Sequence, residues 1–91
     1  MINEFMLGGV KWKVKFDNSR LDDLNLLGLS EFPKSLISLY GGIDNDLIQQ
    51  TLYHEVVHAI LDSMGETALS ANDKFVQNFA LLLHQFETTK K

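Results

Sequence analysis

Residues 51–61 read TLYHEVVHAIL, and this segment indicates both a buried helix and a place for a metal ion. His54 and His58 are four residues apart, so a helix presents both imidazoles on one face, one turn apart, where they can bind a single ion. Glu55 lies about 100° around the helix from His54, close enough to act on a metal-bound water without binding the metal itself. Two neutral nitrogen ligands, an open coordination position and a carboxylate base are the parts of a zinc hydrolase site.

The residues around this motif predict a helix packed between two layers. One apolar stripe continues the histidine side and a second runs beside it, so the helix is apolar on two faces. Imidazoles and a carboxylate are costly to bury on such a helix without a metal or hydrogen-bond partners. The alternative is a metal-free α+β module in which both histidines are hydrogen-bonded core residues and the motif is accidental. The stripes consist of Leu47, Thr51, Leu61 and Met64, and of Ile48, Leu52, Val56 and Ile60.

The composition predicts one domain over residues 1–91 with a single modest core, since 45% of the residues are hydrophobic. The formal charge of −4 argues against nucleic-acid binding, which needs a clustered basic face. Cysteine is absent, so any zinc must be held by histidine and carboxylate. No stretch has the pattern of a signal peptide or membrane span, and we expect a soluble cytoplasmic protein without a membrane partner.

The first half of the chain predicts a small sheet. Gly8-Gly9 is typical of a two-residue hairpin turn with positive φ at both positions. Residues 10–16 alternate between apolar residues and lysine, as a half-buried antiparallel strand does. Pro33-Lys34 predicts a turn between two further strands, and residues 17–25 predict a loop with one helical turn over 19–24. The expected strands are residues 4–7, 10–16, 26–32 and 35–40.

The second half predicts two helices. The first begins within residues 44–46, where Asp46 and Gln49 have capping-box spacing, and ends near Met64, with Gly65 as a left-handed cap. The second covers roughly residues 72–86. The predicted fold is therefore α+β: a small antiparallel sheet of three or four strands packed on two helices.

The third metal ligand must lie beyond the turn that follows the first helix. Asp62 continues the histidine face but lies about 12 Å along the axis from His54, too far to share its ion. Asp73 and His84 are the main candidates, followed by Glu66 and Glu87. Asp73 and His84 share one face of the last helix but lie about 16 Å apart, so only one of them can bind the same ion as the histidine pair. Asp73 can also be read as part of a capping box that begins at Ser70.

Residues 51–59, followed by Asp73, Val76, Phe79 and Ala80 at their spacing, resemble the short phage and prophage members of the ImmA/IrrE-like metallopeptidases. These are compact gluzincin-type zincins, whose second motif is an acidic ligand followed six and seven residues later by Phe-Ala or Ala-Ala. The His-Glu-x-x-His part is specific in kind but is shared by many zincin families. The second motif is weak on its own.

The resemblance implies a minimal zincin-like fold in which a twisted sheet packs on the motif helix. It implies that His54, His58 and Asp73 bind Zn²⁺, with Asp73 in place of the commoner glutamate. In zincins the edge strand beside the cleft pairs with extended peptide, which here would be residues 35–40.

The leading hypothesis from the sequence is thus a zinc metallopeptidase with Glu55 as general base and a peptide or protein as substrate. Tyr40, Tyr53 and His84 are the candidates for contacts with the substrate or transition state. A second hypothesis, from another class, is a catalytically idle zincin fold that binds a protein or peptide. The oligomeric state is open.

Overall fold

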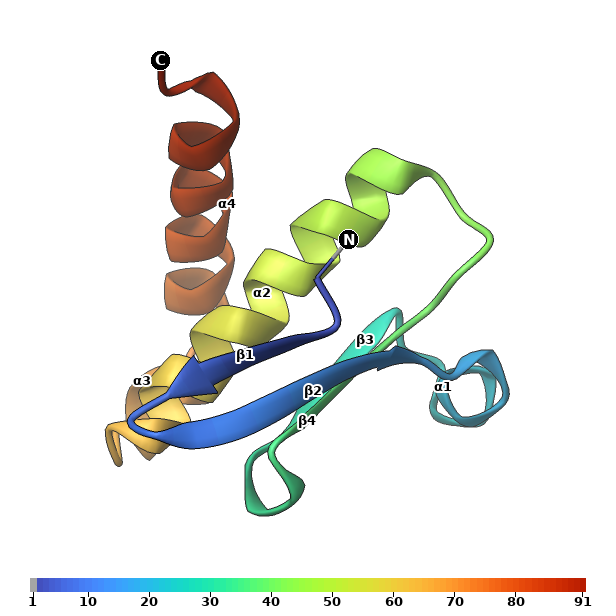
Figure 1. The fold of residues 1–91 in the computed structure, drawn as a ribbon, viewed down its shortest axis with the longest axis horizontal. Coiled ribbons are helices and arrows are strands. Elements are labelled where there is room, and N and C mark those ends of the chain that lie inside the picture. Colours follow the sequence, from blue (N-terminus) through green and yellow to red (C-terminus); the bar gives the residue numbers. More distant parts are fainter. Residues whose placement is uncertain (1) are drawn as a thin grey trace.

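The computed structural model describes residues 2–91 and confirms the α+β class (Figure 1). A four-stranded sheet in the order β1-β2-β4-β3 packs on α2, and α4 packs on the other side of that helix. The strands are β1 (Glu4–Leu7), β2 (Val10–Phe16), β3 (Gly28–Glu31) and β4 (Leu36–Leu39). The helices are α1 (Asn18–Leu24), the 3-10 turn η1 (Phe32–Lys34), α2 (Asn45–Ser63), α3 (Thr67–Ser70) and α4 (Asp73–Thr89).

The β1–β2 hairpin forms as the sequence predicts. Gly8 and Gly9 have φ values of 56° and 81°, which suit the two central positions of a tight hairpin turn. The alternation in β2 buries Trp12 and Val14 against α2. Its two ends, Val10 and Phe16, remain exposed, so only the middle of the strand contributes to the core.

The expectation of a wholly antiparallel sheet is wrong for one pair of strands. β4 lies between β2 and β3 and pairs with β2 in parallel, with Val14 opposite Ile37. Three of the four β4 residues are buried, which suits a strand covered on both faces. The expectation that residues 35–40 form an edge strand is therefore also wrong. The edge strands are β1 and β3, and β3 is the one that packs closely against Thr51 and Glu55 of the motif helix.

The core has two parts, one on each side of α2. Trp12, Val14, Ile37 and Leu39 of the sheet pack against Ile48, Leu52 and Ala59 of α2. On the opposite side, Val57 and Leu61 pack against Val76 and Ala80 of α4. The prediction of a helix packed between layers is thus confirmed. Among residues 2–91, no helix combines the length and apolar character that a membrane span requires.

The ends of α2 show how local chemistry sets its limits. The N-cap is Asp44, whose carboxylate accepts the Leu47 backbone N–H, so the expected capping box at Asp46 is not used. At the other end Gly65 has a φ of 77°. The Glu66 N–H bonds the Leu61 carbonyl, and the Gly65 N–H bonds the Asp62 carbonyl. This is a Schellman end, and it confirms the predicted cap.

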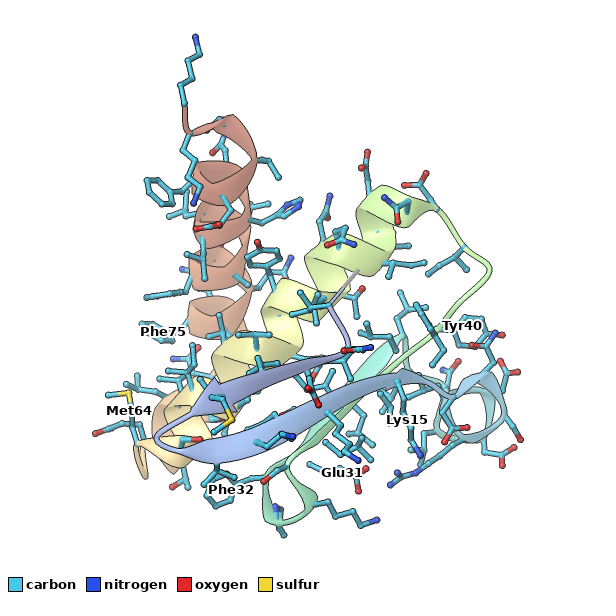
Figure 2. The ribbon with its side chains drawn as sticks, viewed as in Figure 1. Lys15, Glu31, Phe32, Tyr40, Met64 and Phe75 are labelled. Carbon is cyan, nitrogen blue, oxygen red and sulfur yellow. The ribbon has the colours of Figure 1, made fainter. Side chains whose placement is uncertain are left out.

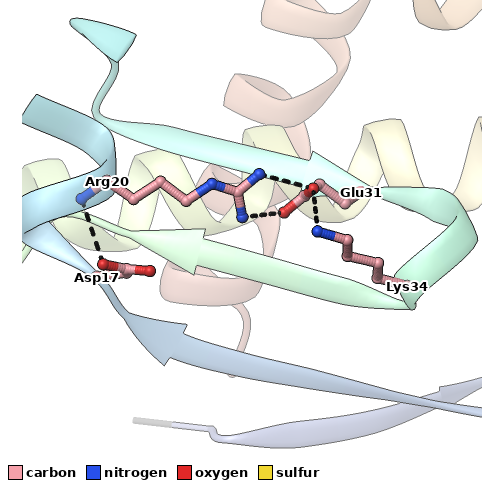
Figure 3. A network of polar contacts seen from close by, with 4 residues as sticks. All are labelled: Asp17, Arg20, Glu31 and Lys34. Carbon is pink, nitrogen blue, oxygen red and sulfur yellow. Dashed lines mark hydrogen bonds and ion pairs between the residues drawn. The ribbon is translucent and has the colours of Figure 1, made fainter. Parts of the chain in front are cut away.

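A charged network holds α1 against the sheet on the face away from α2 (Figure 3). Arg20 makes two hydrogen bonds of 2.6 and 2.8 Å to the carboxylate of Glu31, and Lys34 lies 3.3 Å from the same group. The Arg20 hydrogen bonds, helped by Lys34, lower the pKa of Glu31 to about 2. Asp17 caps α1 by accepting the Arg20 backbone N–H. The network anchors the end of β3, the strand that borders the site described next.

Candidate metal centre

The two motif histidines converge in the structure. Both come from α2, and their Nε2 atoms are 3.3 Å apart, with the rings edge to face at 70°. A tetrahedral zinc ion with Zn–N bonds of 2.0–2.1 Å needs its nitrogen ligands roughly 3.3–3.4 Å apart. The spacing between the two nitrogens therefore matches that of two ligands on one ion.

The other nitrogen of each ring is held by a polar side chain. His54 Nδ1 lies 3.0 Å from Gln77 Oε1 of α4, and His58 Nδ1 lies 3.0 Å from Ser70 Oγ of α3. Because the amide oxygen can only accept, His54 donates from Nδ1 and keeps the lone pair on Nε2. If the Ser70 hydroxyl accepts from His58 Nδ1–H, both Nε2 atoms carry lone pairs that face each other and can bind a cation. If the hydroxyl instead donates to His58 Nδ1, His58 carries its proton on Nε2 and donates it to His54 Nε2.

The surroundings favour the neutral form of His58. Burial lowers its pKa, and the neighbouring His54 adds to this effect, while the charges of Asp62 and Asp73 oppose it. A histidine must be neutral at the ligating nitrogen to bind a metal. His58 is thus suited to ligation at neutral pH.

Glu55 occupies a different part of the helix surface, against the edge strand β3. Its side chain is buried, and desolvation raises its pKa to about 7, opposed by a hydrogen bond from the Ser30 backbone. Gly28 makes this close approach available. A Cβ atom there would lie 3.1 Å from Glu55 Cγ and 2.6 Å from Thr51 Cγ2. A carboxyl group with this pKa can hold or release a proton near neutral pH.

A cleft of about 380 Å³ opens beside His54 and Glu55. Residues 25–28, at the start of β3, form one wall, and α2 forms the other. Gln77 closes the end next to α4. His54 and Glu55 thus line one open cleft together, whereas His58 is not among its lining residues.

The structure does not gather a third ligand around the histidine pair. Within residues 2–91, no three His, Asp or Glu side chains are close enough together to hold a metal ion. Asp73 begins α4 one turn before Gln77, and its charge raises the pKa of His58. It therefore lies near the pair, and its role as third ligand stays a prediction.

The other candidate ligands have different environments. Glu87 forms an ion pair with Lys90 at 3.2 Å, and Glu66 is the N-cap residue of α3. His84 packs on Tyr53, with ring centroids 5.0 Å apart. Neither Asp73 nor any of these three candidates lines the cleft.

The two tyrosines singled out from the sequence also lie outside the cleft lining. The Tyr40 hydroxyl donates to the carboxylate of Asp22 on α1 at 2.6 Å, so it is engaged away from the histidine motif. Tyr53 lines a separate hollow between β1 and α2. Figure 2 shows Tyr40 at the α1 end of the molecule, opposite Phe75 on α4. Contacts between these tyrosines and a substrate therefore have no support from the cleft as the structure forms it.

Sequence reasoning missed the two side chains that orient the imidazoles. The sequence predicts only a capping role for Ser70, but the N-cap of α4 is Asn72, whose side chain accepts the Phe75 N–H. Gln77 lies four residues after Asp73, so the helical spacing could have placed it beside any ligand at that position.

Comparison of this chain with protein-family models, with curated proteins and with solved structures gives no match.

Proposed function

We propose that this protein is a zinc-dependent peptide hydrolase. The observation that carries the proposal is the histidine pair: two Nε2 atoms 3.3 Å apart, with each ring held at Nδ1 by a neighbouring side chain. Ligating histidines commonly have such outer partners, which fix the tautomer and the direction of the ring. A buried carboxylate and an open cleft lie next to the pair.

His54 and His58 would hold the metal, with Asp73 as the proposed third ligand. Imidazole and carboxylate donors suit zinc. When bound, the ion would polarise a peptide carbonyl and acidify a water molecule. Because the chain has no cysteine, its folding needs no oxidising compartment, which supports a cytoplasmic location.

Glu55 would move the proton. Its carboxylate stands between the histidine face of α2 and the edge of β3, at the side of the cleft where a bound peptide would lie. It would take a proton from the attacking water on Oε2 and return it to the leaving amine. Burial excludes competing solvent from the carboxylate during this transfer.

The free edge of β3 is the proposed place for the peptide substrate. The Tyr40 N–H bonds the Leu27 carbonyl at 2.9 Å, and bonding alternates along an antiparallel ladder. Gly28 and Ser30 therefore direct their backbone groups away from β4. The Ser30 amide is engaged by Glu55, which leaves the Gly28 N–H and C=O and the Ser30 C=O for an added strand.

The test compares wild type with Glu55→Gln after zinc loading, on a peptide library read by mass spectrometry. We expect equal zinc content in both proteins and a fall in cleavage rate of at least about 100-fold in the variant. Equal cleavage by both proteins would refute the proposed role of Glu55. Zinc content is measured on protein purified without a histidine tag, and His54→Ala should lower it below one ion per chain.

A second candidate function is a zinc-binding protein that captures peptide without cutting it. The specific observation in its favour is that no third donor joins the pair within residues 2–91. Both functions require bound zinc. Zinc at one ion per chain, with peptides bound and none cleaved, would select the second function.

A further inference from the structure

The outer side of α4 carries apolar side chains that nothing within residues 2–91 covers. Only Val76 and Ala80 of this 17-residue helix are buried, and its C-terminal end points away from the sheet (Figure 1). The exposed residues Phe79, Leu82 and Phe86 follow Phe75 at spacings of four, three and four. This spacing gives one continuous line along a helix, which we term the apolar stripe: Phe75, Phe79, Leu82 and Phe86.

A hollow of about 460 Å³ adjoins the stripe. Phe75 and Phe79 border it on α4, while Met64 at the end of α2 and Leu69 of α3 border it opposite. Figure 2 shows Phe75 and Met64 on the same side of the molecule. The one charged residue among those that line the hollow is Glu66. The hollow can therefore take a large apolar side chain that has a cation beside it.

We propose that a second copy of this chain covers the surface, with the two α4 helices antiparallel. The four-three-four spacing reads the same in both directions, so a reversed α4 places its Phe86 opposite Phe75 and its Leu82 opposite Phe79. Phe86 of each copy then enters the hollow of the other. Phe86 already has Lys90 over its ring at 5.8 Å, so the same movement brings this ammonium towards Glu66 of the other copy.

The charges and the area agree with a self-association of modest strength. Glu66 makes no ion pair within the described chain 2–91, and Lys90, which pairs with Glu87 of its own helix at 3.2 Å, supplies the opposite charge. Met64, Phe79, Leu82 and Phe86 are each 50–65% exposed. At roughly 100 Å² apiece they offer about 400 Å² per copy, or about 800–1,000 Å² for a dimer including the hollows. Interfaces of this size are weak and transient.

The experiment is sedimentation equilibrium from about 5 to 500 µM in the presence of a chelator, so that metal bridging cannot contribute. We expect a reversible dimer with a dissociation constant on the order of 10–100 µM. Phe86→Asp should raise this constant at least about 30-fold. Leu81→Asp is the matched control, since Leu81 is 49% exposed on the same helix but lies roughly 160° around from Phe79.

Charge exchange tests the orientation of the two copies. Glu66→Lys and Lys90→Glu should each weaken the dimer about threefold to tenfold, and the double variant should recover to within about threefold of wild type. A wild-type chain that stays monomeric at the highest concentration would overturn the proposal. So would an equal effect of Leu81→Asp and Phe86→Asp, or a double variant no better than the single ones. Circular dichroism confirms that each variant is folded.

Discussion

Gly28→Ala is expected to destabilise the protein because of one close approach between β3 and α2. A Cβ atom at this position would lie 2.6 Å from Thr51 Cγ2 and 3.2 Å from Glu55 Oε2. Gly28 is not among the residues with positive φ, so the cost comes from overlap and not from backbone strain. Overpacking of this kind destabilises a protein by about 1–3 kcal/mol. Replacing glycine with alanine also lowers the conformational entropy of the unfolded chain, which offsets about 0.5 kcal/mol of this cost.

Thr51→Ser provides a matched rescue. It removes the methyl group nearest to the added Cβ while retaining a hydroxyl that can keep the 2.8 Å bond to the Leu47 carbonyl. In the wild-type background we expect it to cost about 0.5–1 kcal/mol, the value of a partly buried methyl group. In the Gly28→Ala background it should restore at least about 1 kcal/mol, so the two changes couple.

The assay is urea unfolding of wild type, both single variants and the double variant, followed by circular dichroism at 222 nm. The free energies of unfolding form a double-mutant cycle. If Gly28→Ala is as stable as wild type, or if Thr51→Ser costs the same in both backgrounds, Gly28 does not pack closely on Thr51, and the reasoning is refuted.

Two further predictions concern polar contacts. Gln77→Leu removes the acceptor of the His54 Nδ1–H and should weaken zinc binding about 10–100-fold, as measured by chelator competition. Gln50 lines the same cleft, and Gln50→Leu should leave zinc binding unchanged. Equal losses in the two variants would contradict the orienting role of Gln77. Arg20→Met should lower the free energy of unfolding at pH 7 relative to wild type, because it removes both hydrogen bonds to the Glu31 carboxylate. The pKa of Glu31 is lowered from 4.5 to about 2, so the stability difference between wild type and Arg20→Met is present above pH 4.5 and disappears as the pH falls towards 2. A difference in thermal unfolding that stays constant over this pH range would refute the assignment.

Features that depend on a few adjacent residues were predictable from the sequence. The Gly8-Gly9 turn and the cap at Gly65 were predictable because glycine readily adopts the positive φ that both features require. The position of α2 was predictable from its apolar periodicity. The 3.3 Å separation of the histidine nitrogens has the same local origin, because a single helix carries both rings.

Features that depend on distant segments were not predictable in the same way. The parallel insertion of β4 between β2 and β3 is a pairing choice between segments about twenty residues apart, and each strand alone is compatible with either direction. The position of Asp73 depends on where the chain re-enters as α4 after α3. The short helix α3 lies within residues expected to be only a connection, and it supplies Ser70 to His58.

This division between local and distant contributions extends to the chemistry. In the proposed site, zinc affinity would depend chiefly on two imidazoles of one helix, whereas placement of the carboxylate depends on contact between Glu55 and the edge strand β3. Gly28→Ala acts on that contact and leaves Gln77 and Ser70 in place. It should therefore lower peptide cleavage by a larger factor than it lowers zinc affinity, because a displacement of the base by a fraction of an ångström affects proton transfer more than it affects ligation. Equal losses in both measurements would mean that the histidine pair and the edge strand respond as one unit.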